Sequence, residues 1–182
     1  MFDPEILSPV FRDFGATGIA VMADARMGGC TSQDLADFVE EQRRAKSKVP
    51  GPVAVINNDI ILDELQIARS AALHVAAVVL TLDMVGADAL PQLLRAAAAV
   101  NLESIVAVST ADEAQLAVDL GARIISVVNV DGIDEKLACI DGLIVPEHQQ
   151  VCKIANILAK NNKQLTEIEE AWAVRDKGFQ CA

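Results

Sequence analysis

Six short apolar runs divide the chain at nearly even intervals, and each run is continuous rather than alternating between apolar and polar residues. The runs cover residues 18–23, 53–56, 75–80, 104–108, 124–128 and 154–158. Continuous apolar runs of this length are typical of strands that are buried on both faces of a parallel sheet. The pattern therefore predicts six parallel strands covered by helices.

Polar stretches with helix-capping signals separate the apolar runs. Ser32 supplies a capping residue ahead of the apolar positions Leu35 and Phe38. Thr110 and Glu113 have the spacing of a capping box, and Gly121 marks the end of the helix that follows. Further helices are expected ahead of Asn101, near residues 135–140 and over residues 165–178. Strict alternation of strands and helices predicts βαβ units and an α/β fold.

Chain length bears on how such a sheet is completed. A (β/α)8 barrel typically takes about 250 residues, or about 31 per unit, so a chain of this size holds about six units. Considered alone, the length of 182 residues favours an open doubly wound sheet. No linker or low-complexity tract divides the sequence, which predicts a single domain over residues 1–182.

Composition and net charge argue against nucleic acid and the membrane interior as binding partners of this chain. Aromatic residues make up only 3% of the chain, so the core is expected to be aliphatic. A net charge of −11 repels nucleic acid, and nucleic-acid binding is not expected. The longest apolar run, residues 74–82, is far shorter than the ~18–20 residues of a membrane span, so the protein is predicted to be soluble and not membrane-spanning. The residues after Met1 lack the basic and apolar regions of a signal peptide.

The cysteines and histidines show no pattern of a metal site, and no metal or cofactor is predicted. The cysteines are too sparse for a disulfide scaffold, which favours a reducing compartment and predicts buried apolar thiols at Cys30, Cys139, Cys152 and Cys181. Neither His74 nor His148 stands in an arrangement with a cysteine, serine or second histidine that suggests a catalytic triad or a metal site. We expect His74 to lie in the core or in an edge strand. The pair Gly28–Gly29 lacks both the GxGxxG spacing and the lysine of a P-loop, and predicts a simple turn.

Polar residues at the ends of the predicted strands are the candidates for a ligand site. In parallel α/β folds, functional residues gather where the strands end. The candidates are Asp24, Arg26, Asn58, Asn129 and Lys160. An asparagine amide does not exchange protons near neutral pH, so Asn58 and Asn129 could hold a ligand but not act as an acid or base. The nearby acids, Asp59 and Asp131, are as well suited to capping a helix or bracing a loop.

Two segments of the chain resemble indole-3-glycerol-phosphate synthases. Residues 58–67 are similar to the family's Lys-Asp-Phe-Ile-Ile-Asp-x-x-Gln-Ile, and residues 120–131 are similar to its Leu-Gly-Ala-x-x-Ile-Gly-x-Asn-Asn-Arg-Asp. A looser likeness at residues 3–6, 19–24 and 169–179 extends the resemblance over almost the whole chain. In this register the first strand corresponds to the family's second. The resemblance implies an incomplete (β/α)8 barrel of the TIM-barrel type, which lacks the first βα unit and the end of the last strand.

The resemblance also implies which residues stand at the family's functional positions. The family closes an indole ring on a phosphorylated ribulosyl anthranilate, using a cationic general acid, carboxylates and a phosphate anchor. Its catalytic lysine falls on Asn58 and its catalytic glutamate on Ala107. The remaining positions are its Asn-Asn-Arg at residues 128–130, its Glu-Ser-Gly at residues 160–162 and its ring-packing phenylalanine at Ile60. Because the chemical groups of the family are replaced, no catalytic residue is assigned.

A non-catalytic relative, retained as a scaffold or accessory subunit of a larger assembly, is the function that this resemblance favours. The strands beside the missing elements would have unpaired edges, so other protein chains are the expected partners. Two alternatives are a protein that binds a small phosphate ligand through the five candidates, and an active synthase, a carbon-carbon lyase of tryptophan biosynthesis. In photosynthetic organisms the family works in plastids, so the expected compartments are the cytoplasm and the plastid stroma.

Overall fold

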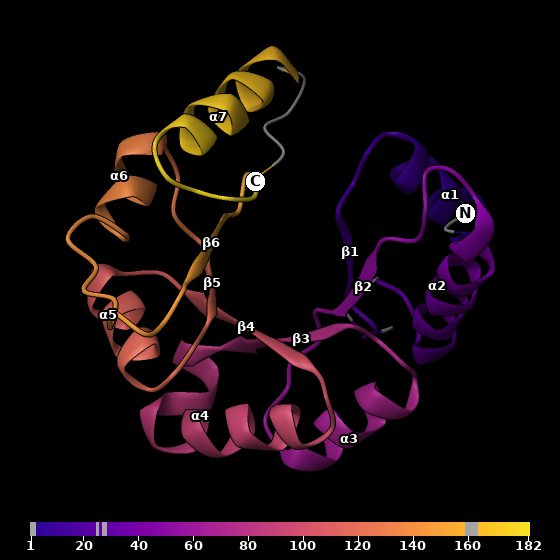
Figure 1. Ribbon diagram of the computed structural model, residues 1–182, viewed down its shortest axis with the longest axis horizontal. Helices are drawn as coiled ribbons and strands as arrows, with labels where there is room; N and C mark the ends of the chain where they lie inside the picture. Colours follow the sequence, from indigo (N-terminus) through magenta and orange to yellow (C-terminus); the bar gives the residue numbers. More distant parts are fainter. Residues whose placement is uncertain (1–2, 25, 27–28, 159–163) are drawn as a thin grey trace. The chain divides into compact units, whose positions relative to one another are not determined.

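The computed structural model describes residues 3–24, 26, 29–158 and 164–182. Within them, six strands alternate with helices along the chain (Figure 1). The strands are β1 (Gly18–Val21), β2 (Ala54–Asn57), β3 (Ala77–Thr81), β4 (Glu103–Val108), β5 (Ile124–Val127) and β6 (Cys152–Ala155). The helices are α1 (Pro4–Asp13), α2 (Ser32–Arg44), the 3-10 turn η2 (Ala45–Ser47), α3 (Glu64–Ala72), α4 (Leu82–Ala99), α5 (Ala111–Asp119), α6 (Ile133–Ala138) and α7 (Gln164–Asp176).

The strands follow one another in the sheet in sequence order. The pairings β1–β2, β2–β3, β4–β5 and β5–β6 are parallel. A doubly wound sheet reverses its strand order at a switch point, whereas a (β/α)8 barrel keeps sequence order throughout. The α/β prediction is therefore confirmed as an incomplete (β/α)8 fold, with six of the eight strands among the described residues. The open doubly wound sheet favoured by length alone is wrong.

The chain forms two compact units. The first comprises Met1–Val79 and Arg95–Ser104, and the second comprises Leu80–Leu94 and Ile105–Ala182. The first unit contains α1, β1, α2, β2 and α3, the second contains α5, β5, α6, β6 and α7, and β3, α4 and β4 contribute residues to both. The single domain expected over residues 1–182 stays a prediction.

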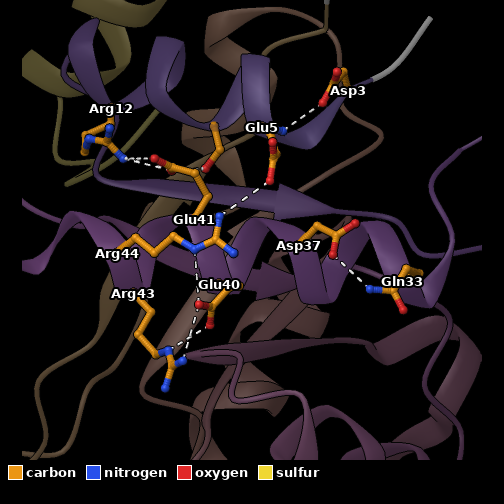
Figure 2. A network of polar contacts seen from close by, with 10 residues as sticks. Asp3, Glu5, Arg12, Gln33, Asp37, Glu40, Glu41, Arg43 and Arg44 are labelled. Carbon is orange, nitrogen blue, oxygen red and sulfur yellow. Dashed lines mark hydrogen bonds and ion pairs between the residues drawn. The ribbon is translucent and has the colours of Figure 1, made fainter.

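A buried polar network joins the two N-terminal helices in the first unit (Figure 2). Arg12 of α1 is 3% exposed, and its Nη1 donates to Glu41 Oε1 and Oε2 of α2 at 2.9 and 2.8 Å. Glu41 Oε2 also accepts from Ser8 Oγ at 2.7 Å. The neighbouring Gln42 accepts from the main-chain N–H of Val53 through its side-chain oxygen at 2.9 Å. The network therefore connects α1, α2 and the start of β2.

Local capping accounts for where the helices begin. Thr31, one residue ahead of the expected Ser32, caps α2: its Oγ1 accepts from the N–H of Asp34, and its own N–H donates to the Asp34 carboxylate. The main-chain N–H and the hydroxyl of Thr31 both donate to Asp34 Oδ2, and these two hydrogen bonds lower the pKa of Asp34. A second capping box, between Asp63 and Gln66, begins α3. These two residues carry part of the family resemblance, and their role in this chain is to start a helix.

In the second unit, a buried ion pair joins α6 to α7. Lys136 Nζ lies 2.7 Å from Glu170 Oε1, and both side chains are less than one-tenth exposed. The parallel register of β5 and β6 pairs Ile124 with Cys152 and Val127 with Ala155. The sixth strand therefore begins two residues earlier than the apolar run at 154–158 predicts, because hydrogen bonding to the neighbouring strand rather than hydrophobicity sets its limits.

Burial of the cysteines and of His74 differs in part from the expectation. Cys30 and Cys139 are buried, and burial raises the pKa of both thiols. Cys152 and Cys181 are only half-buried, so the expectation of four buried thiols is right for two of them. His74 is exposed and precedes β3 with a φ of 60°, rather than lying in the core or in a strand. Among the described residues, none of the helices combines the length and apolar character needed to span a bilayer.

Candidate functional site

Asp24 and Arg26 lie beyond the carboxyl end of β1 and form an ion pair. Arg26 Nε donates to Asp24 Oδ1 at 3.0 Å, Arg26 Nη2 donates to Oδ2 at 2.8 Å, and the main-chain N–H of Arg26 donates to Oδ1 at 2.9 Å. The side-chain bonds lower the pKa of Asp24 and raise that of Arg26. The Arg26 side chain is 90% exposed and that of Asp24 is 11% exposed. The guanidinium therefore faces solvent, while its Nε–Nη2 edge is held by the carboxylate.

Asn58 follows β2 and lies at the same end of the first unit. Its main-chain N–H donates to the carbonyl of Val21, the last residue of β1, at 2.8 Å. Asp59 contributes to the raised pKa of Arg26 through its charge, so the loops after β1 and β2 are electrostatically linked. The structure thus brings three of the five candidates, Asp24, Arg26 and Asn58, to the carboxyl ends of two neighbouring strands.

Asn57 is a buried amide that was not among the candidates, and it shapes this turn. It is 8% exposed, its Nδ2 donates to Ser70 Oγ at 2.9 Å, and its Oδ1 accepts from the N–H of Asp59 at 3.1 Å. Asp59 in turn accepts from the N–H of Ile60, which makes it a loop-bracing residue. The continuously apolar run at residues 53–56 does not indicate which face is buried, and the structure shows that residues 55 and 57 share the buried face of β2.

Close backbone packing follows β1. Cys30 donates its main-chain N–H to the carbonyl of Met22 at 3.1 Å. A Cβ added at Gly29 would lie 2.8 Å from the same oxygen, so only glycine fits there without movement of the backbone. The predicted turn is present at Gly29, whereas Gly28 lies outside the described residues.

In the second unit, hydrogen bonds within the protein hold the loops that follow β4 and β5. The N–H of Val128 donates to the carbonyl of Val108 at 2.9 Å. Asn129, the next residue, is exposed and has a left-handed backbone conformation with a φ of 58°. The Glu113 carboxylate accepts from the N–H of Ser109 at 2.6 Å, which ties the loop after β4 to α5. Asn129 is thus the single candidate placed in this unit, since Lys160 lies outside the described residues.

The positions that the resemblance assigns to the family's catalytic groups differ in environment. Ala107 lies within β4 and is 4% exposed. Val128 and Val130 are half-buried, and Ile60 is 40% exposed. Across residues 3–24, 26, 29–158 and 164–182, no three His, Cys, Asp or Glu side chains form a group that could hold a metal ion. The described polar groups therefore offer hydrogen bonding and charge, without a metal centre.

Comparison with known proteins gives matches over most of the chain. The family model for indole-3-glycerol phosphate synthase matches residues 1–137. An indole-3-glycerol phosphate synthase from Leptospira interrogans is 31% identical over 126 residues, which are 69% of this chain and 46% of the relative. One from Kineococcus radiotolerans is 26% identical over 175 residues, which are 94% of this chain and 60% of the relative. The chain spans about half the length of the first of these relatives.

Similarity to solved structures concerns the fold alone. The N-acetylmannosamine-6-phosphate 2-epimerase from Clostridium perfringens superposes with a TM-score of 0.68 at 12% identity, over 98% of this chain and 76% of that structure. At this level of identity, a shared fold carries no information about shared chemistry.

Proposed function

The chain belongs to the indole-3-glycerol phosphate synthase family of tryptophan biosynthesis, and we propose that it is a non-catalytic member that serves as a scaffold or accessory subunit of a larger assembly. The observation that carries this proposal is the pair of side chains at the two proton-transfer positions of the family. These positions hold Asn58, a half-buried amide, and Ala107, a buried methyl group.

Asn58 supports loss of the general acid. A lysine ammonium donates a proton, whereas an amide neither gains nor loses one near neutral pH. The hydrogen bond from its N–H to the carbonyl of Val21 holds the main chain after β2 beside the end of β1. General acid–base catalysis typically contributes about 10²–10⁴-fold for each group.

Ala107 supports loss of the second proton-transfer group. Its side chain has no functional group, and it is packed within β4 at 4% exposure. Among the acids nearby in the chain, Glu113 accepts a hydrogen bond from Ser109 and is held as a structural residue. Together with the change at Asn58, this leaves the reaction without either proton-transfer group.

An apolar face on α1 supports the accessory role. Side chains four residues apart share one face of a helix. On α1 this face holds Ile6 at 62% and Val10 at 40% exposure, and the residue that caps the end of the helix, Phe14, extends it at 88% exposure. Exposed apolar patches of this kind mark interaction surfaces.

An activity assay tests the loss of catalysis. The purified chain is incubated with the phosphorylated ribulosyl anthranilate, and formation of the indole product is followed by fluorescence. We expect no rate above the uncatalysed background, with or without the substitutions Asn58→Lys and Ala107→Glu. Turnover close to that of an ordinary synthase that is lost in Asn58→Ala would contradict the proposal, and would support the active-synthase alternative.

Size analysis of the native protein tests the accessory role. In extracts of the source cells, the endogenous chain should elute with a larger mass than the isolated recombinant chain. A chain with the substitution Phe14→Asp should no longer join the assembly and should elute at the mass of the isolated chain, because a charge would then lie within the apolar face of α1. Val49→Asp is the matched control, since Val49 is 99% exposed and lies outside α1. An endogenous chain that elutes as a monomer, or loss of assembly in both variants alike, would count against the proposal.

A phosphate-binding role is the second candidate, favoured by the shared position of Asp24, Arg26 and Asn58 at the carboxyl ends of β1 and β2. It predicts heat on titration with sugar phosphates and its loss in Arg26→Ala. The guanidinium is already bonded to Asp24, so an incoming anion has to share it. A titration without heat would exclude this role while leaving the accessory role untouched.

A further inference from the structure

A pocket of about 400 Å³ lies in the first unit, between the end of α2 and the beginnings of β2 and β3. Pockets that bind small molecules usually measure about 300–1,000 Å³. Its apolar lining includes Val39, Val53 and Val55, and its polar lining includes Arg43, Lys46 and His74. It lies where the strands begin, whereas the candidates at Asp24 and Asn58 lie where the strands end. No family position discussed above belongs to it.

Two of the polar side chains that line this pocket, Arg43 and Lys46, are cationic, in a chain whose net charge is −11. Arg43 donates through Nε and Nη2 to Glu40, which leaves Nη1 uncommitted among the described residues. For the ammonium of Lys46 and the ring of His74, the described part of the chain provides no hydrogen bond or ion pair. Lys46 and His74 therefore border the pocket as groups able to donate to an anion, with no acceptor among the described residues.

Helix capping explains only part of this charge. Basic residues at the end of a helix stabilise its dipole, and the effect falls off within the last turn. Arg43 and Arg44 lie in the last turn of α2 and fit that role. Lys46 belongs to the following turn η2, and His74 comes from a separate segment ahead of β3. Their convergence on the same pocket as Arg43 is not accounted for by the dipole of α2.

We propose that this pocket binds a small organic anion, whose carboxylate or phosphate group lies against Lys46 and His74 and whose apolar part lies against Val39 and Val53. The pairing of an apolar floor with a few polar groups is the usual composition of a ligand site. Because the pocket is separate from the strand ends, binding there is independent of whether the chain catalyses a reaction.

Titration with a simple probe tests the proposal. Phenyl phosphate combines an oxyanion with an apolar ring, and its binding is followed residue by residue through amide chemical shifts in NMR spectra. We expect saturable shifts at residues 46, 53 and 74. Benzoate tests whether a carboxylate is preferred to a phosphate, and inorganic phosphate, which lacks the apolar part, should bind more weakly than either.

Charge reversal supplies matched variants. Lys46→Glu should raise the Kd of phenyl phosphate about tenfold, because attraction becomes repulsion at short range. Lys48→Glu changes the net charge equally at an exposed residue outside the lining, and should raise the Kd less than about twofold. His74→Asn keeps a residue that tolerates a positive φ while removing the imidazole, and should raise the Kd about threefold.

Three results would overturn the proposal. The first is the absence of saturation at about 10 mM probe, a concentration that reveals even weak sites. The second is an equal effect of Lys46→Glu and Lys48→Glu, which would indicate diffuse attraction to a basic surface. The third is a set of shifts centred on Asn58 instead of residue 46. All substituted residues are exposed, so circular dichroism should show each variant folded as the parent.

Discussion

Removal of the Glu41 carboxylate should destabilise the first unit severely. The substitution Glu41→Ala deletes the acceptor of both Arg12 bonds and of the Ser8 hydroxyl, and also the acceptor of a 3.0 Å bond from Gln42 Nε2. The Arg12 side chain is only 4% exposed, so its guanidinium would remain buried without a counter-charge. An uncompensated buried charge, rather than the loss of attraction itself, is the main source of the effect.

The expected loss of unfolding free energy follows from the burial of the Arg12–Glu41 ion pair. Breaking a buried ion pair by removing one partner typically costs about 3–5 kcal/mol. For a chain of this size each kcal/mol lowers Tm by about 2–4 °C, so the midpoint should fall by about 6–20 °C. Glu40→Ala is the matched control, because Glu40 is 38% exposed and pairs with exposed Arg43 and Arg44. The loss in this control should be about 0–1 kcal/mol.

Urea unfolding at pH 7, followed by circular dichroism, measures the loss of stability in Glu41→Ala and in Glu40→Ala. The free energy of unfolding comes from linear extrapolation, and an unchanged slope would show that stability alone has changed. The double variant Arg12→Leu with Glu41→Leu should lie within about 2 kcal/mol of the parent, because apolar residues often replace a buried pair without loss. Equal losses in Glu41→Ala and Glu40→Ala, or a double variant as unstable as Glu41→Ala, would refute this reasoning.

Three further outcomes test other parts of the structure. Gly29→Ala should cost about 1–3 kcal/mol in urea unfolding because its Cβ meets a main-chain oxygen. Gly51→Ala, whose Cβ would lie 4.0 Å from the carbonyl oxygen of Lys48 in ordinary van der Waals contact, should cost less than about 0.5 kcal/mol. Asp34 has a lowered pKa, so its contribution to stability is complete above its ordinary pKa and is lost as the pH falls through the lowered value. Asp34→Asn should therefore flatten the pH dependence of Tm below about pH 4. An unchanged pH dependence in this variant would show that the bonds between Thr31 and Asp34 do not stabilise the fold. Ellman's reagent should modify two thiols much more slowly than the others at pH 8, and rapid reaction of all four would contradict the burial described. The slow thiols are Cys30 and Cys139.

The residues of the candidate site could be predicted only in part from the sequence. Asp24 and Arg26 were predicted as strand-end residues, and the structure shows that they bind each other. Asn58 was singled out for its polarity and its register with the family, yet the buried amide that shapes the turn is Asn57. Which of two adjacent amides enters the core depends on the direction of the strand face, and the helix that provides Ser70 decides it. The pocket bordered by Lys46 and His74 joins segments that no short motif connects.

The sequence by itself determined the alternation of strands and helices and the Thr110 cap that starts α5, because hydrophobic runs and capping bonds act within a few residues. The caps of α2 and α3, at Thr31 and Asp63, were identified only in the structure. Tertiary structure decided the order of the strands, the limits of β6 and the buried ion pairs. The pair of Arg12 with Glu41 spans 29 residues, and that of Lys136 with Glu170 spans 34. Such contacts depend on where the chain returns after each helix, and local periodicity carries no information about that return.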